Sequence, residues 1–244
     1  MKYLGSLFLI LFLSISSSAQ ENKKGETIFG LEFKALIPSR ILNAGPVTLG
    51  DDSIDVTVKS QKGYSIGMVV RHNFTKMFSL ETGLHLTNSY YPILFKNTNQ
   101  GIDEASQIQL TNYELPIQGL LYIRLGEQIY MNTIFGISLD FFPTDVTITE
   151  DSYAYIIIVD SWIQASLLAS VGFEYRTKKS GYFYIGSTIH RPFSDIGTFK
   201  LSYYHDNILS DYITFSSPIN GTYLSIDLRY FFPKKEKVEA PKYY

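Results

Sequence analysis

Four histidines are the residues of this sequence best suited to acid–base chemistry: His72, His85, His190 and His205. A hydrolase or acyltransferase needs a serine, a histidine and a carboxylate within hydrogen-bond reach. Serines are abundant and Glu81 lies close to His85, so a lipid-modifying site is one hypothesis. No Gly-x-Ser-x-Gly motif or other nucleophile signature accompanies these residues. The simpler interpretation is that His85 and His190 are hydrogen-bonded structural residues, and that the chain has no catalytic residue.

Metal and cofactor chemistry has equally little support. The sequence contains no cysteine, which excludes disulfides, thiolate metal sites and a cysteine nucleophile. Short acidic clusters, whose carboxylates resemble weak Ca²⁺ ligands, occur at Asp51, Asp52 and Asp55 and at Asp103 and Glu104. They are more simply solvated loop acids. The sequence therefore predicts neither a resident metal nor a cofactor.

The elements that would position any such site are β-strands. Alternation of apolar and polar residues predicts eight of them, at 27–37, 63–72, 77–91, 107–125, 129–142, 161–176, 182–191 and 219–232. The connections between them alternate between short turns and long loops, and prolines at 38, 92, 143 and 192 begin the long ones. Short turns on one side and long loops on the other are typical of outer-membrane barrels. We therefore predict an all-β fold: an eight-stranded antiparallel transmembrane up-and-down β-barrel with long extracellular loops and short periplasmic turns.

One face of the predicted strands gathers charge. Six acidic and five basic residues share it: Glu32, Lys34, Arg71, Glu81, Glu114, Arg124, Asp140, Glu174, Arg176, Asp227 and Arg229. Arginine predominates over lysine there, and its planar guanidinium suits bidentate carboxylate pairs in a poorly hydrated space. Aromatic residues gather near the strand ends, as in membrane girdles. These features favour a membrane barrel with a charged lumen over a soluble lipocalin-like barrel, whose lumen is apolar.

Two further features concern the loops and the wall. The last long loop is rich in aromatic residues, namely Phe199, Tyr203, Tyr204, Tyr212 and Phe215. They indicate either a binding surface or a strand pair that extends the barrel, and residues 53–59 alternate in the same way.

Pro116 lies within a predicted strand and cannot donate a ladder hydrogen bond, so we expect a β-bulge there.

The two ends of the chain are predicted to be a targeting signal and a C-terminal tail. Residues 1–19 combine Lys2, an apolar run from Leu4 to Ile15 and small residues up to Ala19, which predicts a signal peptide cleaved near Ala19. The expected organisation is then a periplasmic segment at 20–26, a barrel at 27–232 and a periplasmic tail at 233–244. The predicted location is the outer membrane of a Gram-negative bacterium.

Three segments resemble a known family. Tyr113-Glu114-Leu115-Pro116-Ile117-Gln118-Gly119-Leu120-Leu121-Tyr122, Gly172-Phe173-Glu174-Tyr175 and the strand from Leu224 to Phe231 are similar to strands of the PorT-like outer-membrane β-barrel proteins of the Bacteroidota. The resemblance implies an eight-stranded outer-membrane barrel. The namesake of the family assists a secretion system, but most members have no assigned activity.

The 244 residues, 45% of them hydrophobic and with a net charge of −2, give no basic face for nucleic acid. The expected partners are outer-membrane lipid and an envelope or secretion-complex protein, and the expected state is a monomer. We predict a non-enzymatic barrel with a plugged lumen, which acts as a structural or interaction protein through its long loops. A small-solute porin-like channel and a barrel-embedded lipid-modifying enzyme are the alternatives.

Overall fold

The computed structural model describes residues 25–37, 46–50, 53–59, 62–149, 153–177, 179–204 and 212–233. Their regular structure consists of β-strands, and none of these residues forms a helix long and apolar enough to cross a membrane. The predicted signal peptide, its cleavage point near Ala19, His205 and all of the tail except Pro233 lie outside the described residues.

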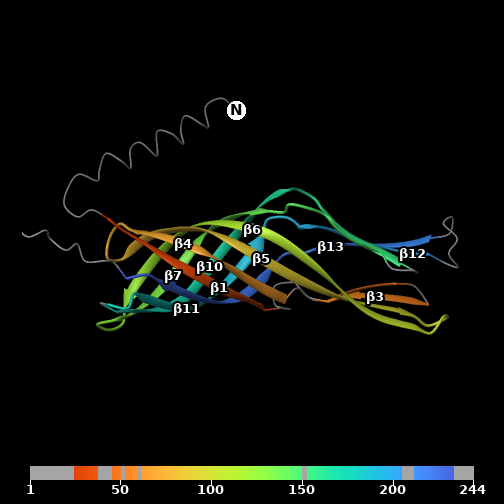
Figure 1. The fold of residues 1–244 in the computed structure, drawn as a ribbon, viewed down its shortest axis with the longest axis horizontal. Coiled ribbons are helices and arrows are strands. Elements are labelled where there is room, and N and C mark those ends of the chain that lie inside the picture. Colours follow the sequence, from red (N-terminus) through yellow and green to blue (C-terminus); the bar gives the residue numbers. More distant parts are fainter. Residues whose placement is uncertain are drawn as a thin grey trace, which may run out of the picture.

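Eight strands close into a barrel, shown on the left of Figure 1. They are β1 (Glu26–Ile37), β4 (Lys62–Asn73), β5 (Phe78–Asn97), β6 (Ile102–Arg124), β7 (Ile129–Phe141), β10 (Ile163–Arg176), β11 (Tyr182–Pro192) and β14 (Tyr223–Phe231). Their order around the ring is β5-β4-β1-β14-β11-β10-β7-β6, every neighbouring pair is antiparallel, and pairing of β5 with β6 closes it. This confirms the predicted eight-stranded antiparallel up-and-down barrel.

Three short turns join strands at the periplasmic end. In the turn between β4 and β5, the hydroxyl of Thr75 accepts hydrogen bonds from the backbone N–H of Met77 and of Phe78, at 3.1 and 2.9 Å. In the turn between β10 and β11, Gly181 has a φ of 83°, a conformation that glycine adopts without steric cost. Local side-chain bonds and one glycine thus close turns whose short length was evident from the sequence.

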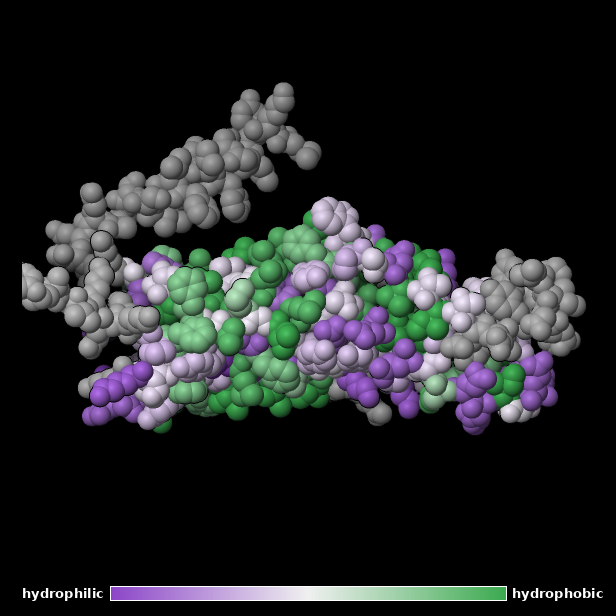
Figure 2. All heavy atoms as spheres, in the orientation of Figure 1, coloured by the Kyte–Doolittle hydropathy of each residue, from purple (hydrophilic) through white to green (hydrophobic). Residues whose placement is uncertain are grey.

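The barrel is apolar on the outside. Large hydrophobic side chains such as Phe135 and Met68 are more than half exposed, whereas the alternate positions of the same strands are buried. Figure 2 shows the resulting green surface over the barrel. Exposed aromatics gather near the turns, for example Phe74 and Phe183, and again at the opposite end, for example Trp162 and Phe193. Two aromatic girdles around an apolar band are the signature of a barrel in lipid.

Much of the described part of the four long connections consists of further β-strands. Strands β5 and β6 continue beyond the barrel, and β2 (Val47–Gly50) and β3 (Ile54–Val58) add to the free edge of β5. A second sheet has the order β13-β12-β9-β8, formed by β8 (Val146–Thr149), β9 (Tyr153–Val159), β12 (Gly197–Tyr204) and β13 (Tyr212–Ile219). We call these six strands and the outer parts of β5 and β6 the extension; it occupies the right of Figure 1.

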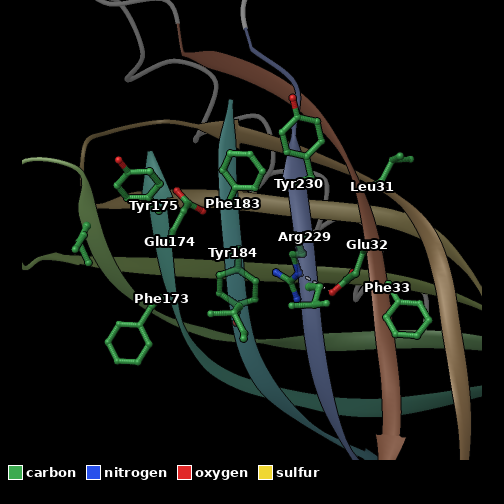
Figure 3. A pocket seen from close by; sticks show the side chains of 13 residues that line it. Leu31, Glu32, Phe33, Phe173, Glu174, Tyr175, Phe183, Tyr184, Arg229 and Tyr230 are labelled. Atoms are coloured by element: carbon green, nitrogen blue, oxygen red, sulfur yellow. Dashed lines mark hydrogen bonds and ion pairs between the residues drawn. The ribbon is translucent and has the colours of Figure 1, made fainter. Parts of the chain in front are cut away.

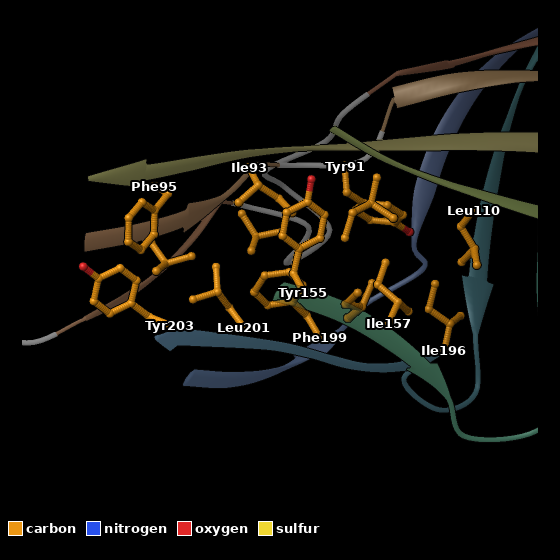
Figure 4. Packing of buried hydrophobic residues seen from close by; sticks show 14 of the residues in the cluster. Tyr91, Ile93, Phe95, Leu110, Tyr155, Ile157, Ile196, Phe199, Leu201 and Tyr203 are labelled. Atoms are coloured by element: carbon orange, nitrogen blue, oxygen red, sulfur yellow. The ribbon is translucent and has the colours of Figure 1, made fainter. Parts of the chain in front are cut away.

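The two sheets of the extension enclose an apolar core. Side chains from β5, such as Ile93 and Phe95, face Leu201 and Tyr203 of β12 (Figure 4). Phe95 and Tyr203 stack with ring centroids 5.4 Å apart. Burial of apolar area stabilises such a core by about 25 cal/mol per Å². The extension is therefore a folded unit rather than a set of flexible loops.

Strands β5 and β6 pass through both regions, and their inward faces change character on the way. The inward residues of β5 are mostly polar from Ser79 to Ser89 and are apolar from Tyr91 to Phe95. On β6, the inward residues Ile108 and Leu110 lie in the apolar core, whereas the next ones toward the periplasm are Asn112 and Glu114. The change from apolar to polar marks the boundary between the extension and the barrel.

Pro116 occupies an unbulged strand, so the predicted bulge is wrong. The register of β5 against β6 is the same on both sides of it, with Thr82 opposite Ile117 and His85 opposite Glu114. On its other side Pro116 pairs with Ser138 of β7. The proline carbonyl accepts a hydrogen bond from the Thr82 hydroxyl at 2.8 Å. A side-chain donor thus bridges the gap in the ladder without an inserted residue.

Candidate functional site

The lumen of the barrel brings together ten of the eleven charged residues predicted to face it. Nine are at most 4% exposed: Glu32, Lys34, Arg71, Glu81, Glu114, Asp140, Glu174, Asp227 and Arg229. The tenth, Arg176, is partly exposed near the periplasmic end and donates to Glu174 at 2.6 Å. Strand alternation alone places these side chains on one face.

Arg124 is the exception, and its assignment to the lumen is wrong. It has the same parity as Glu114 on β6, but it is the last residue of the strand and is exposed. Its Nε donates to the carbonyl of Gly126 in the following turn, at 2.8 Å. Alternation along a strand identifies which face a residue lies on, but not its position along the barrel axis. At the position of Arg124 the lumen has already ended.

Arginines form a network in the lower lumen. Arg71 donates to Glu81 at 2.8 Å and to Glu174. Arg229 donates to Glu32 and to Glu81, each at 2.6 Å. Because Glu81 accepts from both arginines, the pairs form one continuous chain of charges. Buried ion pairs of this kind are sustained only where each charge has partners, as here.

Some of these pairs cross the lumen. Arg71 stands on β4 and Glu174 on β10, which lie four places apart in the eight-stranded ring and so on opposite walls. The hydroxyl of Tyr223 on β14 reaches Glu114 on β6, also on the opposite wall, at 3.1 Å. Side chains therefore bridge the full width of the barrel at two levels.

The upper lumen combines charges with hydroxyl groups. Lys34 lies 3.0 Å from Glu114, and His190 Nε2 lies 3.1 Å from Asp140 Oδ2. Asp140 also accepts from Ser166 at 2.5 Å, and Asp227 accepts from Ser225 at 2.5 Å. These hydroxyl partners were not predicted from the sequence. Their signal was the small polar residues at inward positions of β10 and β14.

Gly67 leaves room for the side chain of His85 to extend across a neighbouring strand. His85 on β5 lies across Gly67 of β4 and contacts Glu32 of β1, with 2.7 Å between Nε2 and Oε2. A Cβ at Gly67 would collide with the imidazole of His85. The missing side chain is thus what allows the histidine to pair two strands away.

Both ends of the lumen are closed by apolar groups. At the periplasmic end Tyr122, Ile134 and Tyr184 form a buried cluster with Leu120, and Arg176 lies 4.2 Å from the ring centroid of Tyr130. At the other end the core of the extension begins. The cation–π contact between Arg176 and Tyr130 connects the charged network to the aromatic cluster at the periplasmic end.

The arrangement around His190 does not match a catalytic triad. Ser138 Oγ lies 3.3 Å from His190 Nε2, but Asp140 contacts that same nitrogen. A triad uses the two ring nitrogens separately, one for the nucleophile and one for the carboxylate. All three side chains are at most 4% exposed. The geometry offers structural hydrogen bonds rather than an activated serine.

The aromatic binding candidates in the last long loop are largely core residues. Phe199 and Tyr203 are buried between the two sheets, and Phe215 is partly buried against the same core. An exposed binding surface formed by Phe199 and Tyr203 is therefore a wrong prediction, because the loop itself folds into β12 and β13 with these residues facing inward. Tyr204 and Tyr212 pair in the backbone ladder, while their side chains lie outside the described part.

The described members of the two acidic loop clusters lie on either side of a lysine, since Lys96 of β5 pairs with Asp55 of β3 and with Asp103 of β6. Asp103 lies 3.6 Å from Lys96 on the exposed surface, Asp55 is exposed on β3, and Asp51 and Asp52 lie outside the described residues. Within the described part of the chain, the group of three side chains with metal-ligand spacing is instead Glu114, Asp140 and His190. It was not predicted, since its members come from three different strands.

The outer wall carries an apolar groove of about 680 Å³. Leu31, Phe33, Phe173, Phe183 and Tyr230 surround it, while Glu32 and Arg229 pair behind them (Figure 3). Its lining belongs to the exposed hydrophobic band of the barrel. In a membrane this groove faces acyl chains, so it belongs to the lipid-facing surface.

Comparison with known proteins supports the fold. The outer membrane protein OprG from Pseudomonas aeruginosa matches with a TM-score of 0.51 and 14% identity, over 88% of this chain and 99% of that chain. The outer membrane protease OmpT from Escherichia coli covers 88% of this chain and 100% of its own, but with a TM-score of 0.33 and 10% identity it carries no argument. No family model and no curated protein matches the sequence. The chain thus has an outer-membrane barrel fold similar to that of OprG.

Proposed function

We propose that this protein is a non-enzymatic, non-conducting outer-membrane barrel that holds a folded platform, the extension, outside the cell for interaction with another envelope component. The observation that carries the proposal is the ion pair between Arg71 and Glu174, which joins opposite walls of a barrel that is also capped at both ends. The lumen acts as a structural strut, and the surface that remains for function is the extension.

The packing of the lumen argues against the porin-like alternative. An eight-stranded barrel has an interior just wide enough for side chains. Here Arg71 and Glu174 fill its centre, and both side chains have no exposed surface. A solute path would require these groups to separate and leave buried charges unpaired, at a cost of about 3–5 kcal/mol.

The same packing argues against an embedded enzyme. A lipid substrate would have to reach Ser138 or Ser166, and both are completely buried. The groove on the outer wall lies on the other side of the strands from these hydroxyls. The structure thus offers no shared space for a lipid ester and a nucleophile in the described part of the chain.

The proposal also covers the processing of the chain, its oligomeric state and the class of its partner. The signal peptide is removed near Ala19, the protein works as a monomer, and its partner belongs to the envelope. The resemblance of the strands around Glu114 and Glu174 to PorT-like proteins suggests a secretion accessory as that partner class. Sequencing of the amino terminus from an outer-membrane fraction should begin at Gln20; an intact Met1 would contradict this point.

A planar-bilayer recording tests the closed lumen. The wild-type protein should give no steady conductance, whereas Arg71→Ala/Glu174→Ala combined with Tyr223→Ala and Tyr122→Ala, which removes both bridges across the lumen and opens the periplasmic cluster, should conduct. Arg191→Ala serves as the control because Arg191 is exposed at the end of β11. Steady conductance of the wild-type protein would favour the pore.

A truncation tests the extension. All four connections should be shortened together, since they share one core and the loss of one would expose the others. The truncated barrel should still insert and should still migrate faster on a gel before boiling than after. Cross-linked envelope partners of the full chain should disappear. Retention of those partners, together with their loss in a folded Arg71→Ala/Glu174→Ala variant, would make the lumen the functional region.

A further inference from the structure

The upper lumen contains an arrangement of metal-binding type. Glu114 on β6, Asp140 on β7 and His190 on β11 each present a ligand atom, and these three atoms lie within 4.8 Å of one another. All three residues are at most 4% exposed. Three strands of the barrel wall thus direct two carboxylates and an imidazole at one point.

The charges around this point are not balanced by the protein alone. In the lower lumen, Glu32, Glu81 and Glu174 face three arginines, Arg71, Arg176 and Arg229. The upper lumen, in contrast, has three carboxylates and one fixed cation of its own, although one of the carboxylates, Asp227, also lies 3.9 Å from Arg229.

Those carboxylates belong to Glu114, Asp140 and Asp227, and the cation is Lys34. Over the lumen as a whole, six carboxylates face four fixed cations, so an excess of two negative charges remains among the described residues when His85 and His190 are neutral. Buried charges are strongly unfavourable unless they are paired or coordinate a metal. A divalent cation would balance this excess.

The imidazole of His190 has one ring nitrogen without a hydrogen-bond partner. His190 Nε2 contacts Asp140, but its Nδ1 is buried and has no hydrogen-bond partner. The ring is held in place by Tyr223, which stacks on it with centroids 4.4 Å apart and an interplanar angle of 7°. A ring nitrogen that is buried without a hydrogen-bond partner, in a histidine held beside two carboxylates, indicates that this imidazole can take a ligand.

We propose that Glu114, Asp140 and His190 bind one divalent transition-metal cation of the Zn²⁺ type inside the barrel. Imidazole and carboxylate ligands suit Zn²⁺, whereas Ca²⁺ and Mg²⁺ favour oxygen ligands alone. Tyr223, Ser138 and Ser166 supply hydroxyl groups around the same carboxylates. The cation would tie β6, β7 and β11 together at the level just below the extension.

The closed ends of the lumen determine when the cation enters. Apolar clusters cover this level from both directions, with Leu120 and Tyr122 below and Leu110 and Phe142 above. A folded barrel should therefore exchange the cation slowly. Incorporation should occur while the strands assemble.

Refolding of the full-length protein tests the proposal. The chain should be refolded into detergent micelles with ZnCl₂, passed through a chelating resin, and its zinc measured by mass spectrometry. We expect one zinc per wild-type chain and a content near zero for His190→Gln. His85→Gln is the matched control, since His85 is an equally buried histidine beside a carboxylate, and it should keep its zinc. Protein refolded without metal should take up zinc much more slowly than it does during refolding.

Two results would contradict the zinc site. A wild-type chain that retains no zinc after refolding, or equal zinc in His190→Gln and His85→Gln, would overturn the assignment. If His190→Gln fails to show the gel shift of a folded barrel, Glu114→Gln replaces it, and Co²⁺ absorption in the visible range gives a second readout. Loss of the cobalt bands in a folded Glu114→Gln barrel supports the site; unchanged bands refute it. The result does not depend on whether the extension binds a partner.

Discussion

The barrel and the extension are built from the same kind of antiparallel strand, yet they are inverted with respect to each other. In the barrel, charged side chains such as Arg229 lie inside and apolar ones such as Ile226 lie outside. In the extension, Leu201 lies inside, and Lys200 faces outward. The contrast shows that neither pattern is intrinsic to the strand. The medium outside decides it: lipid requires an apolar exterior, and water permits a polar one.

The largest effect should come from a charge in the lumen. Arg229→Leu leaves Glu32 and Glu81 without their shared partner and should destabilise the barrel by about 3–5 kcal/mol. Arg191→Leu removes an exposed arginine and should cost about 0–1 kcal/mol. Urea unfolding in lipid vesicles measures both. Equal shifts would mean that the two faces of the barrel have been exchanged.

A cavity in the extension should act only on the extension. Leu201→Ala removes a fully buried side chain and should cost about 2–5 kcal/mol of local stability. Protease should then cleave the extension faster while the gel shift of the barrel stays unchanged. Leu228→Ala, on the lipid-facing wall, is the control and should leave the cleavage rate as it is. Simultaneous loss of barrel and extension would show that they unfold as one unit.

A charge placed on the outer face should distinguish the two media. Ile226→Arg introduces a cation where Ile226 is 45% exposed to lipid, and should cost about 2–4 kcal/mol near the midplane. Thr147→Arg, on the outer face of the extension, should stay within about 0.5 kcal/mol of the wild type. The measurement is again unfolding in vesicles. A harmless Ile226→Arg would remove the evidence that this band meets lipid.

The smallest effect should come from a single methyl group in the lumen. Gly67→Ala pushes against His85, which then loses its contact with Glu32, and against the backbone carbonyl of Leu84, and the cost should be about 1–3 kcal/mol. Gly119→Ala is the matched control, because an added Cβ there meets Phe78 at 3.6 Å, an ordinary contact. Melting of the gel shift with temperature compares them. A neutral Gly67→Ala would show that the close packing of His85 and Leu84 against Gly67 adds no stability.

Much of the barrel was predictable because its information is local. Alternation with a period of two identifies each strand and its faces, and Thr75 and Gly181 mark tight turns without reference to the rest of the chain. The same alternation placed Glu32 and Lys34 together. It failed where depth mattered, as at Arg124, because parity does not say where the barrel ends.

What the tertiary structure alone decided is which strands meet. Arg71 and Glu174 are 103 residues apart, and no local pattern specifies that β4 and β10 face each other across the lumen. Likewise Phe199 and Tyr203 look like exposed loop aromatics until a second sheet covers them. The long loops carry the alternation of strands, but whether such strands find partners depends on the closure of the ring, which brings all four connections to one end. Pairing, depth and burial are properties of the assembled barrel, and the free energy that selects them comes from contacts between residues distant in the chain.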